Sequence, residues 1–101
     1  MPMQEKPNYT FMFFYSNYNP QSLRVKIALN EVVGQLPRSL LIKINEVDFD
    51  NDKVMCKKYK ISGSPTLLIF RNRHLMEKYF GELDKDDFDT IIKELDKDKR
   101  R

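Results

Sequence analysis

The chain alternates between short apolar runs and segments in which apolar residues recur with helical spacing. The apolar runs predict strands at Tyr9–Tyr15, Leu40–Phe49 and Thr66–Phe70, and a fourth strand at Leu75–Phe80 that is antiparallel to the third. Because the first run is apolar at both odd and even positions, we expect a central strand that is covered on both faces of its sheet.

Helical spacing of apolar residues predicts a helix over Ser22–Val33, a short helix over Asn51–Tyr59 and a last helix that follows Asp84. Asp84 and Asp87 are three residues apart, which is typical of a pair that caps a helix N-terminus. The predicted order is β-α-β-α-β-β-α. It indicates an α/β fold with a mixed four-stranded sheet and helices on both faces.

The chain length of 101 residues indicates one domain. We expect an N-terminal extension over 1–8, the domain itself over 9–95 and a charged C-terminal tail over 96–101. The formal net charge is +3, and the tail holds two of these three positive charges, so the body of the domain has no broad basic stripe and nucleic acid is not an expected partner.

One cysteine and one histidine exclude an internal disulfide and a structural zinc site, and we expect no metal and no other cofactor. The chain has no long apolar run and no secretory signal pattern. These features predict a cytoplasmic protein that does not bind a membrane.

Ser64-Pro65-Thr66 stands directly before an apolar strand and resembles the second half of thioredoxin-like proteins. The resemblance implies that Pro65 is cis and that the backbone beside it pairs with bound peptide. Thioredoxins carry two cysteines where this chain has the turn Asn19-Pro20-Gln21-Ser22, and superfamily enzymes tend to keep a buried acid where it has Phe13. Thiol–disulfide chemistry is therefore excluded at this turn.

The segment Tyr15–Val25 resembles the KaiB family's Tyr-Val-Ala-Gly-x-Thr-Pro-Asn-Ser-x-Arg-Ala. The identical positions are Pro20, Ser22 and Arg24. Lys60–Leu67 resembles that family's Lys-Ile-Leu-Ala-Thr-Pro-Thr-Leu, and Gly81–Asp84 resembles its Gly-Asp-Leu-Ser. KaiB proteins switch between a ground-state fold that forms a tetramer and a thioredoxin-like fold. The patterning of this chain favours the thioredoxin-like fold, and the ground-state fold stays an alternative.

The KaiB resemblance implies a non-enzymatic regulator that binds a KaiC-like ATPase in a circadian-clock or stress-timing system. A histidine-kinase output protein is a further expected partner, and one fold state is expected to form a dimer or tetramer. The resemblance implies Tyr9, Arg24 and Lys43 as partner-binding residues. We expect Lys57 and Lys58, on the predicted short helix, to extend this contact face. The implied structural and fold-switching residues are Ser64, Pro65, Gly81 and Asp84.

Two other functions stay open from the sequence. The first is a redox-inactive thioredoxin-like module that binds peptides or proteins. The second, ranked lowest, is an oxidoreductase that works through Cys56 alone, although we expect that cysteine to pack inward from its short helix.

Overall fold

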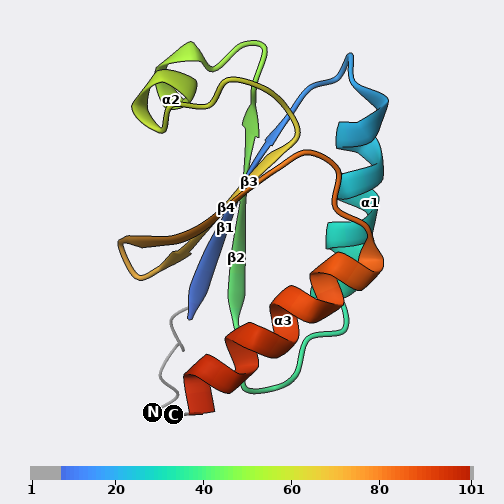
Figure 1. Cartoon of the computed structure of the whole chain (residues 1–101), viewed down its shortest axis with the longest axis vertical. Helices are drawn as coiled ribbons and strands as arrows, with labels where there is room; N and C mark the ends of the chain where they lie inside the picture. The colour runs from blue at the N-terminus through green and yellow to red at the C-terminus, as the bar shows by residue number, and fades with distance from the viewer. Residues whose placement is uncertain (1–7, 101) are drawn as a thin grey trace, which may run out of the picture.

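The strands form one mixed sheet in the computed structural model, which describes residues 8–100 (Figure 1). Their order across the sheet is β2-β1-β3-β4. The central strand β1 (Tyr9–Tyr15) is parallel to β2 (Ile42–Asp48) and antiparallel to β3 (Thr66–Arg71). The last strand, β4 (His74–Phe80), pairs antiparallel with β3. The predicted sheet and its central first strand are therefore confirmed.

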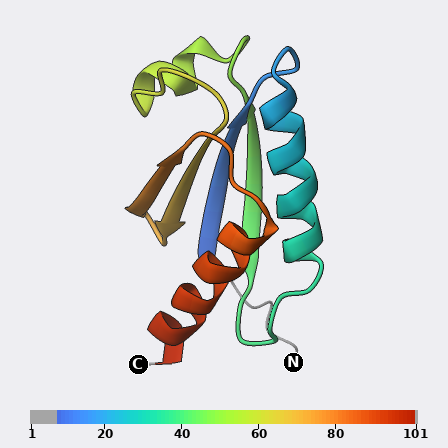
Figure 2. The same cartoon turned by 45° about the vertical axis from the view of Figure 1, so that its right-hand side comes forward.

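Helices cover both faces of this sheet (Figures 1 and 2). The first helix, α1 (Pro20–Val33), and the last helix, α3 (Lys85–Arg100), lie on one face. The short helix α2 (Lys53–Lys58) lies on the other face, near one end of the sheet. Within residues 8–100, no helix has the length and apolar character that a membrane span requires.

Two apolar clusters hold the layers together, and β1 contributes to both. Its side chains alternate across the sheet, so Phe11 and Phe13 pack toward α1 and α3 while Met12 and Phe14 pack toward α2. This explains why the run is apolar at odd and even positions. Phe13, which stands where superfamily enzymes tend to keep an acid, is fully buried.

The C-terminal end differs from the prediction, because α3 continues to Arg100 instead of giving way to a charged tail at residue 96. Asp98 accepts hydrogen bonds from the Tyr9 hydroxyl at 2.9 Å and from Arg71 at 2.8 Å, and these bonds attach the last turns of α3 to β1 and β3. Arg101 and residues 1–7 of the predicted N-terminal extension lie outside the described residues.

Candidate functional site

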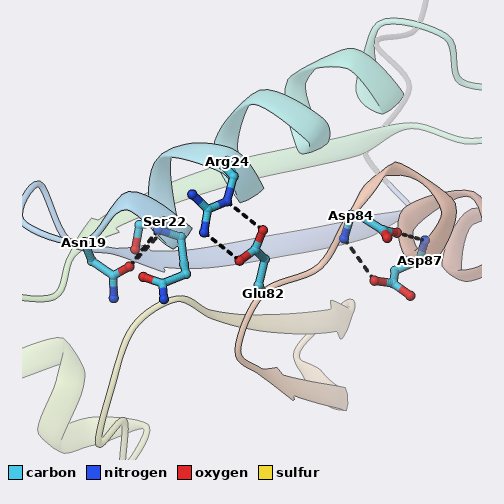
Figure 3. Close-up of polar contacts among 7 residues, drawn as sticks. Asn19, Ser22, Arg24, Glu82, Asp84 and Asp87 are labelled. Carbon is cyan, nitrogen blue, oxygen red and sulfur yellow. Dashed lines mark hydrogen bonds and ion pairs between the residues drawn. The ribbon is translucent and has the colours of Figure 1, made fainter.

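The turn that replaces the two cysteines forms the N-terminus of α1. Asn19 caps the helix, because its side-chain oxygen accepts hydrogen bonds from the backbone N–H groups of Gln21 at 2.9 Å and Ser22 at 3.2 Å (Figure 3). Pro20 occupies the first helical turn, where a missing N–H costs nothing. The side-chain nitrogen of Asn19 donates a third hydrogen bond, of 2.8 Å, to the carbonyl oxygen of Ser64.

Ser22 occupies the second cysteine position but is not placed as a nucleophile. Its side chain is only 2% exposed, and its hydroxyl oxygen accepts a hydrogen bond from the backbone N–H of Ser16 at 3.1 Å. Activation of a serine requires an adjacent general base. The single histidine, His74, lies at the start of β4, and within residues 8–100 no hydrogen bond joins Ser22 to a carboxylate. Ser22 therefore has a structural role.

Ser64 and Pro65 form the loop that faces this turn, and the peptide bond between them is cis, as the resemblance implied. The carbonyl oxygen of Pro65 accepts a hydrogen bond of 2.9 Å from the backbone N–H of Gly81. Gly81 has a φ of +103°, which a residue with a side chain rarely adopts. The backbone freedom of glycine is thus used at the junction between β4 and α3.

Asp84 and Asp87 cap α3 reciprocally, as predicted. The backbone N–H of Asp87 donates to the Asp84 carboxylate at 2.9 Å, and the backbone N–H of Asp84 donates to the Asp87 carboxylate at 2.9 Å (Figure 3). The helix that follows the cis-proline loop and Gly81 therefore begins at a defined position.

Arg24 is exposed, but it is already paired within the chain. Its guanidinium donates two hydrogen bonds to the Glu82 carboxylate, at 2.8 and 3.0 Å (Figure 3). The hydrogen bond from Arg24 lowers the pKa of Glu82. This ion pair links α1 to the segment between β4 and α3, so a partner carboxylate would have to compete with Glu82.

Tyr9 does not offer a surface to a partner in this structure, which corrects the expectation from the resemblance. Its side chain is 2% exposed, and its hydroxyl donates to Asp98 and to the carbonyl oxygen of Leu95. Burial, followed by the hydrogen bond to Asp98, raises the pKa of Tyr9. Tyr9 is buried because it is the first residue of a central strand that α3 covers.

The three lysines expected at the partner surface are exposed and lie on the α2 side of the molecule. Lys57 and Lys58 end α2, and Lys43 pairs with Thr10 in the register of β1 and β2. Of these lysines, Lys58 lines a groove of about 350 Å³, together with Thr10, Arg73 and neighbouring side chains. The structure thus groups the lysines on one face and leaves Arg24 on the opposite helix layer.

Two exposed aromatic residues are chain neighbours of Asn19 and Gly81, which bond to the cis-proline loop, and the sequence prediction did not include them. Tyr18 directly precedes Asn19 and is 87% exposed, and Phe80 directly precedes Gly81 and is 69% exposed. The Phe80 ring lies against Gly63, where an added Cβ would be 2.8 Å from it. We call Tyr18, Gly63, Ser64 and Phe80, together with the buried Pro65 that shapes the loop, the cis-proline surface. An aromatic residue directly before Asn19 and another directly before Gly81 were the available signal.

Cys56 lies outside this surface, on α2. It is buried, and its sulfur lies 3.6 Å from the carbonyl oxygen of Phe49. Burial raises the pKa of the Cys56 thiol, which disfavours the thiolate that attacks disulfides. Residues 8–100 contain no cluster of histidine, cysteine, aspartate and glutamate that could hold a metal ion.

Comparisons with known proteins identify the family to which this architecture corresponds. A family model described as thioredoxin matches residues 4–94 of the chain. The fold is similar to that of thioredoxin-2 of the malaria parasite, with a TM-score of 0.78 and 14% identity over 92% of this chain and 88% of the other. At this identity, the likeness shows the fold alone.

Two further solved structures have the same fold. Trxlp from Edwardsiella tarda EIB202 gives a TM-score of 0.77 with 20% identity over 85% of this chain and 82% of that one. Mitochondrial thioredoxin 3 from Saccharomyces cerevisiae gives 0.74 with 16% identity over 88% and 80% of the two chains. These matches confirm the resemblance to thioredoxin-like proteins, and none of these matches is specific to KaiB proteins.

Proposed function

The chain belongs to the thioredoxin family, whose model matches residues 4–94, and we propose that it is a non-enzymatic member that binds a protein partner through the cis-proline surface. The thioredoxin fold and its cis-proline bond between Ser64 and Pro65 are present. The turn Asn19–Ser22 has no cysteine at the two positions where thioredoxins carry their thiols. Disulfide exchange requires a thiolate, so the function proposed for this surface is the binding of a protein partner.

One observation supports the proposal above all others. The Asn19 side chain occupies the first thiol position and donates its hydrogen bond to the Ser64 carbonyl oxygen at 2.8 Å. A reactive group at this place has been replaced by a polar bridge between α1 and the cis-proline loop. The bridge holds the loop at the surface, where its backbone can pair with an extended peptide, and the Ser64 oxygen keeps a second lone pair for that purpose.

The exposed aromatic residues supply the apolar part of such a contact. Tyr18 is the chain neighbour of Asn19, the Phe80 ring lies against Gly63, and both aromatic side chains are largely exposed. Aromatic side chains dominate the binding energy of many protein interfaces, because they bury a large area with few rotatable bonds. Two of them beside a peptide-pairing backbone suit a partner that presents an extended segment with apolar side chains.

For the identity of the partner, the KaiB resemblance supports a KaiC-like ATPase in a clock or stress-timing system. Its motifs coincide with residues that shape this surface, namely Ser64, Pro65 and Gly81. The exposed Lys43, Lys57 and Lys58 are available for acidic groups of such a partner. This more specific proposal rests on the KaiB resemblance. The same resemblance supports two further proposals, namely a histidine-kinase output protein as a partner and a second, oligomeric fold state.

The test is an affinity measurement between the full chain and a KaiC-like ATPase from the same organism. Tyr18→Ala and Phe80→Ala should each weaken binding about tenfold or more, as expected for aromatic anchors. Ile27→Ala and Leu75→Ala are matched controls, since both side chains are exposed and lie outside the cis-proline surface, and they should leave affinity unchanged. Absence of binding would contradict the proposal of a KaiC-like partner. Equal losses of affinity in all four variants would contradict binding through the cis-proline surface.

A further inference from the structure

A second concave surface lies between the edge strand β4 and helix α3, and none of its lining residues belongs to the cis-proline surface. We call it the β4–α3 groove, and its volume is about 270 Å³. The floor of the groove is apolar. It consists of Ile69, Met76, Tyr79, Ile91 and Leu95.

Carboxylates line the rim of this groove. They belong to Glu77 on β4 and to Glu94 and Asp98 on α3. Asp98 is paired with Arg71, but Glu77 and Glu94 are exposed and form no ion pair within residues 8–100. In the described part of the chain, no lysine or arginine lines the groove. An apolar floor with two available carboxylates is complementary to aliphatic and cationic side chains together.

The groove also borders an unpaired sheet edge. β4 is the last strand in the order β2-β1-β3-β4, so along one side its backbone groups meet no other strand of the described chain (Figure 2). A bulge interrupts its pairing with β3 between Ile69 and Phe70, which leaves Glu77–Phe80 as the regular stretch. An extended segment added there would gain main-chain hydrogen bonds and would direct alternate side chains over the groove.

We propose that the β4–α3 groove binds an extended basic segment of a partner protein, which adds a strand beside Glu77–Tyr79. An aliphatic side chain of the segment lies over Met76 and Tyr79, and the cationic side chains on either side of it pair with Glu77 and Glu94. The site is separate from the cis-proline surface, so it stands whether or not the proposed function is correct.

The probe is the synthetic peptide acetyl-Thr-Lys-Thr-Leu-Thr-Lys-Thr-amide, whose leucine and two lysines share one face of a strand. Its control, acetyl-Lys-Thr-Thr-Leu-Thr-Thr-Lys-amide, has the same composition with the lysines on the opposite face. Titration of the full chain, followed by the shifts of its backbone amide NMR signals, gives both the affinity and the location of binding. We expect shifts along β4 and α3 and weaker binding of the control peptide.

Two variants test the charges. Glu77→Gln combined with Glu94→Gln should weaken binding of the probe about three- to tenfold, with a loss that shrinks at high salt. Glu31→Gln combined with Asp89→Asn removes the same charge from exposed residues that do not line the groove and should leave affinity unchanged. Tyr18→Ala should also leave it unchanged, which separates this site from the cis-proline surface.

Backbone pairing is tested by N-methylation of alternate amides of the probe. Methyl groups on the edge that faces β4 should abolish binding, while the same number on the other edge should preserve it. Equal binding of the two methylated peptides, equal binding of the two variant proteins, or shifts confined to the cis-proline surface would each overturn the proposal. A dimer of the chain that the glutamate variants dissociate would assign the groove to a second copy and would overturn it as well.

Discussion

The side-chain nitrogen of Asn19 donates a hydrogen bond of 2.8 Å to the carbonyl oxygen of Ser64, across the place where thioredoxins carry out disulfide exchange. The same side chain caps α1 through its oxygen. One residue therefore both starts a helix and holds the cis-proline loop, and these two roles can be separated by mutation.

Asn19→Ala should lower the free energy of unfolding by about 0.5–2 kcal/mol, because the cap of α1 is lost. Asn19→Asp keeps the cap acceptor but removes the donor to Ser64, so it should preserve most of the stability while weakening partner binding. Urea unfolding and binding measurements check both effects. Asn17→Ala is the control, since that side chain is exposed and caps no helix. Equal stability loss in the alanine and aspartate variants would show that the bridge, and not the cap, stabilises the fold.

Gly81→Ala should destabilise the protein by about 1 kcal/mol or more, because φ is +103° and not because space is lacking, as no atom lies within 4 Å of an added Cβ. Gly34→Ala is the matched control, since Gly34 has a φ of −69° and an added Cβ would make only ordinary contacts. Thermal or urea unfolding of the two variants checks the difference. Similar stability in both would contradict the assigned role of Gly81.

If the KaiB-like switch operates in this chain, Gly81→Ala should also weaken binding to a KaiC-like ATPase and shift the protein toward a larger oligomer. Only the fraction in the competent fold binds, so a destabilised thioredoxin-like state lowers the apparent affinity. Size-exclusion chromatography with light scattering, beside the binding measurement, checks this. A monomer with a lowered melting temperature and unchanged affinity would show a single fold.

Exchange of the charges of Arg24 and Glu82 tests whether Arg24 acts through its ion pair with Glu82 or through a contact with a partner. Arg24→Glu alone leaves two carboxylates facing each other and should lower stability slightly. Adding Glu82→Arg restores the pair and should restore stability. Partner affinity that stays low in the exchanged protein would assign Arg24 to the interface, whereas recovery of affinity would assign it to the internal pair.

The ion pair between Arg24 and Glu82 also predicts that the stability of the fold depends on pH in the acidic range. Because the pKa of Glu82 is lower in the folded protein than its ordinary value of about 4.3, the pair stabilises the fold above that value and loses this effect as pH falls through the folded pKa. Glu82→Gln should reduce the fall in stability over this acidic range. Urea unfolding at several pH values measures it, and an unchanged pH profile would contradict the pairing.

The fold could be predicted largely from the sequence because its elements depend on local patterns. The apolar run of β1 is buried at odd and at even positions. The reciprocal cap of α3 joins Asp84 and Asp87, which are three positions apart. Such features need no knowledge of distant neighbours. The strand and helix limits moved by only a few residues for the same reason, apart from the C-terminal end of α3.

The site was less predictable because its contacts join residues that are distant in the chain. The burial of Tyr9 follows from Asp98 on the last helix, and the pairing of Arg24 follows from Glu82 beyond β4. Sequence patterns could place Arg24 on an exposed helix face but could not identify an internal partner. The two exposed aromatic residues precede Asn19 and Gly81, whose contacts with Ser64 and Pro65 form only in the folded chain.

The central claim is that a thioredoxin scaffold is retained here while its thiol chemistry is absent. The most direct test is insulin reduction with dithiothreitol by the natural chain and by the variant Asn19→Cys combined with Ser22→Cys, with Asn19→Ala combined with Ser22→Ala as the thiol-free control. The helix N-terminus should lower the pKa of the first introduced thiol. We predict no stimulation by the natural chain or the alanine control and clear stimulation by the cysteine variant. Reduction by the natural chain that disappears in Cys56→Ser, or no activity in a folded cysteine variant, would contradict the claim.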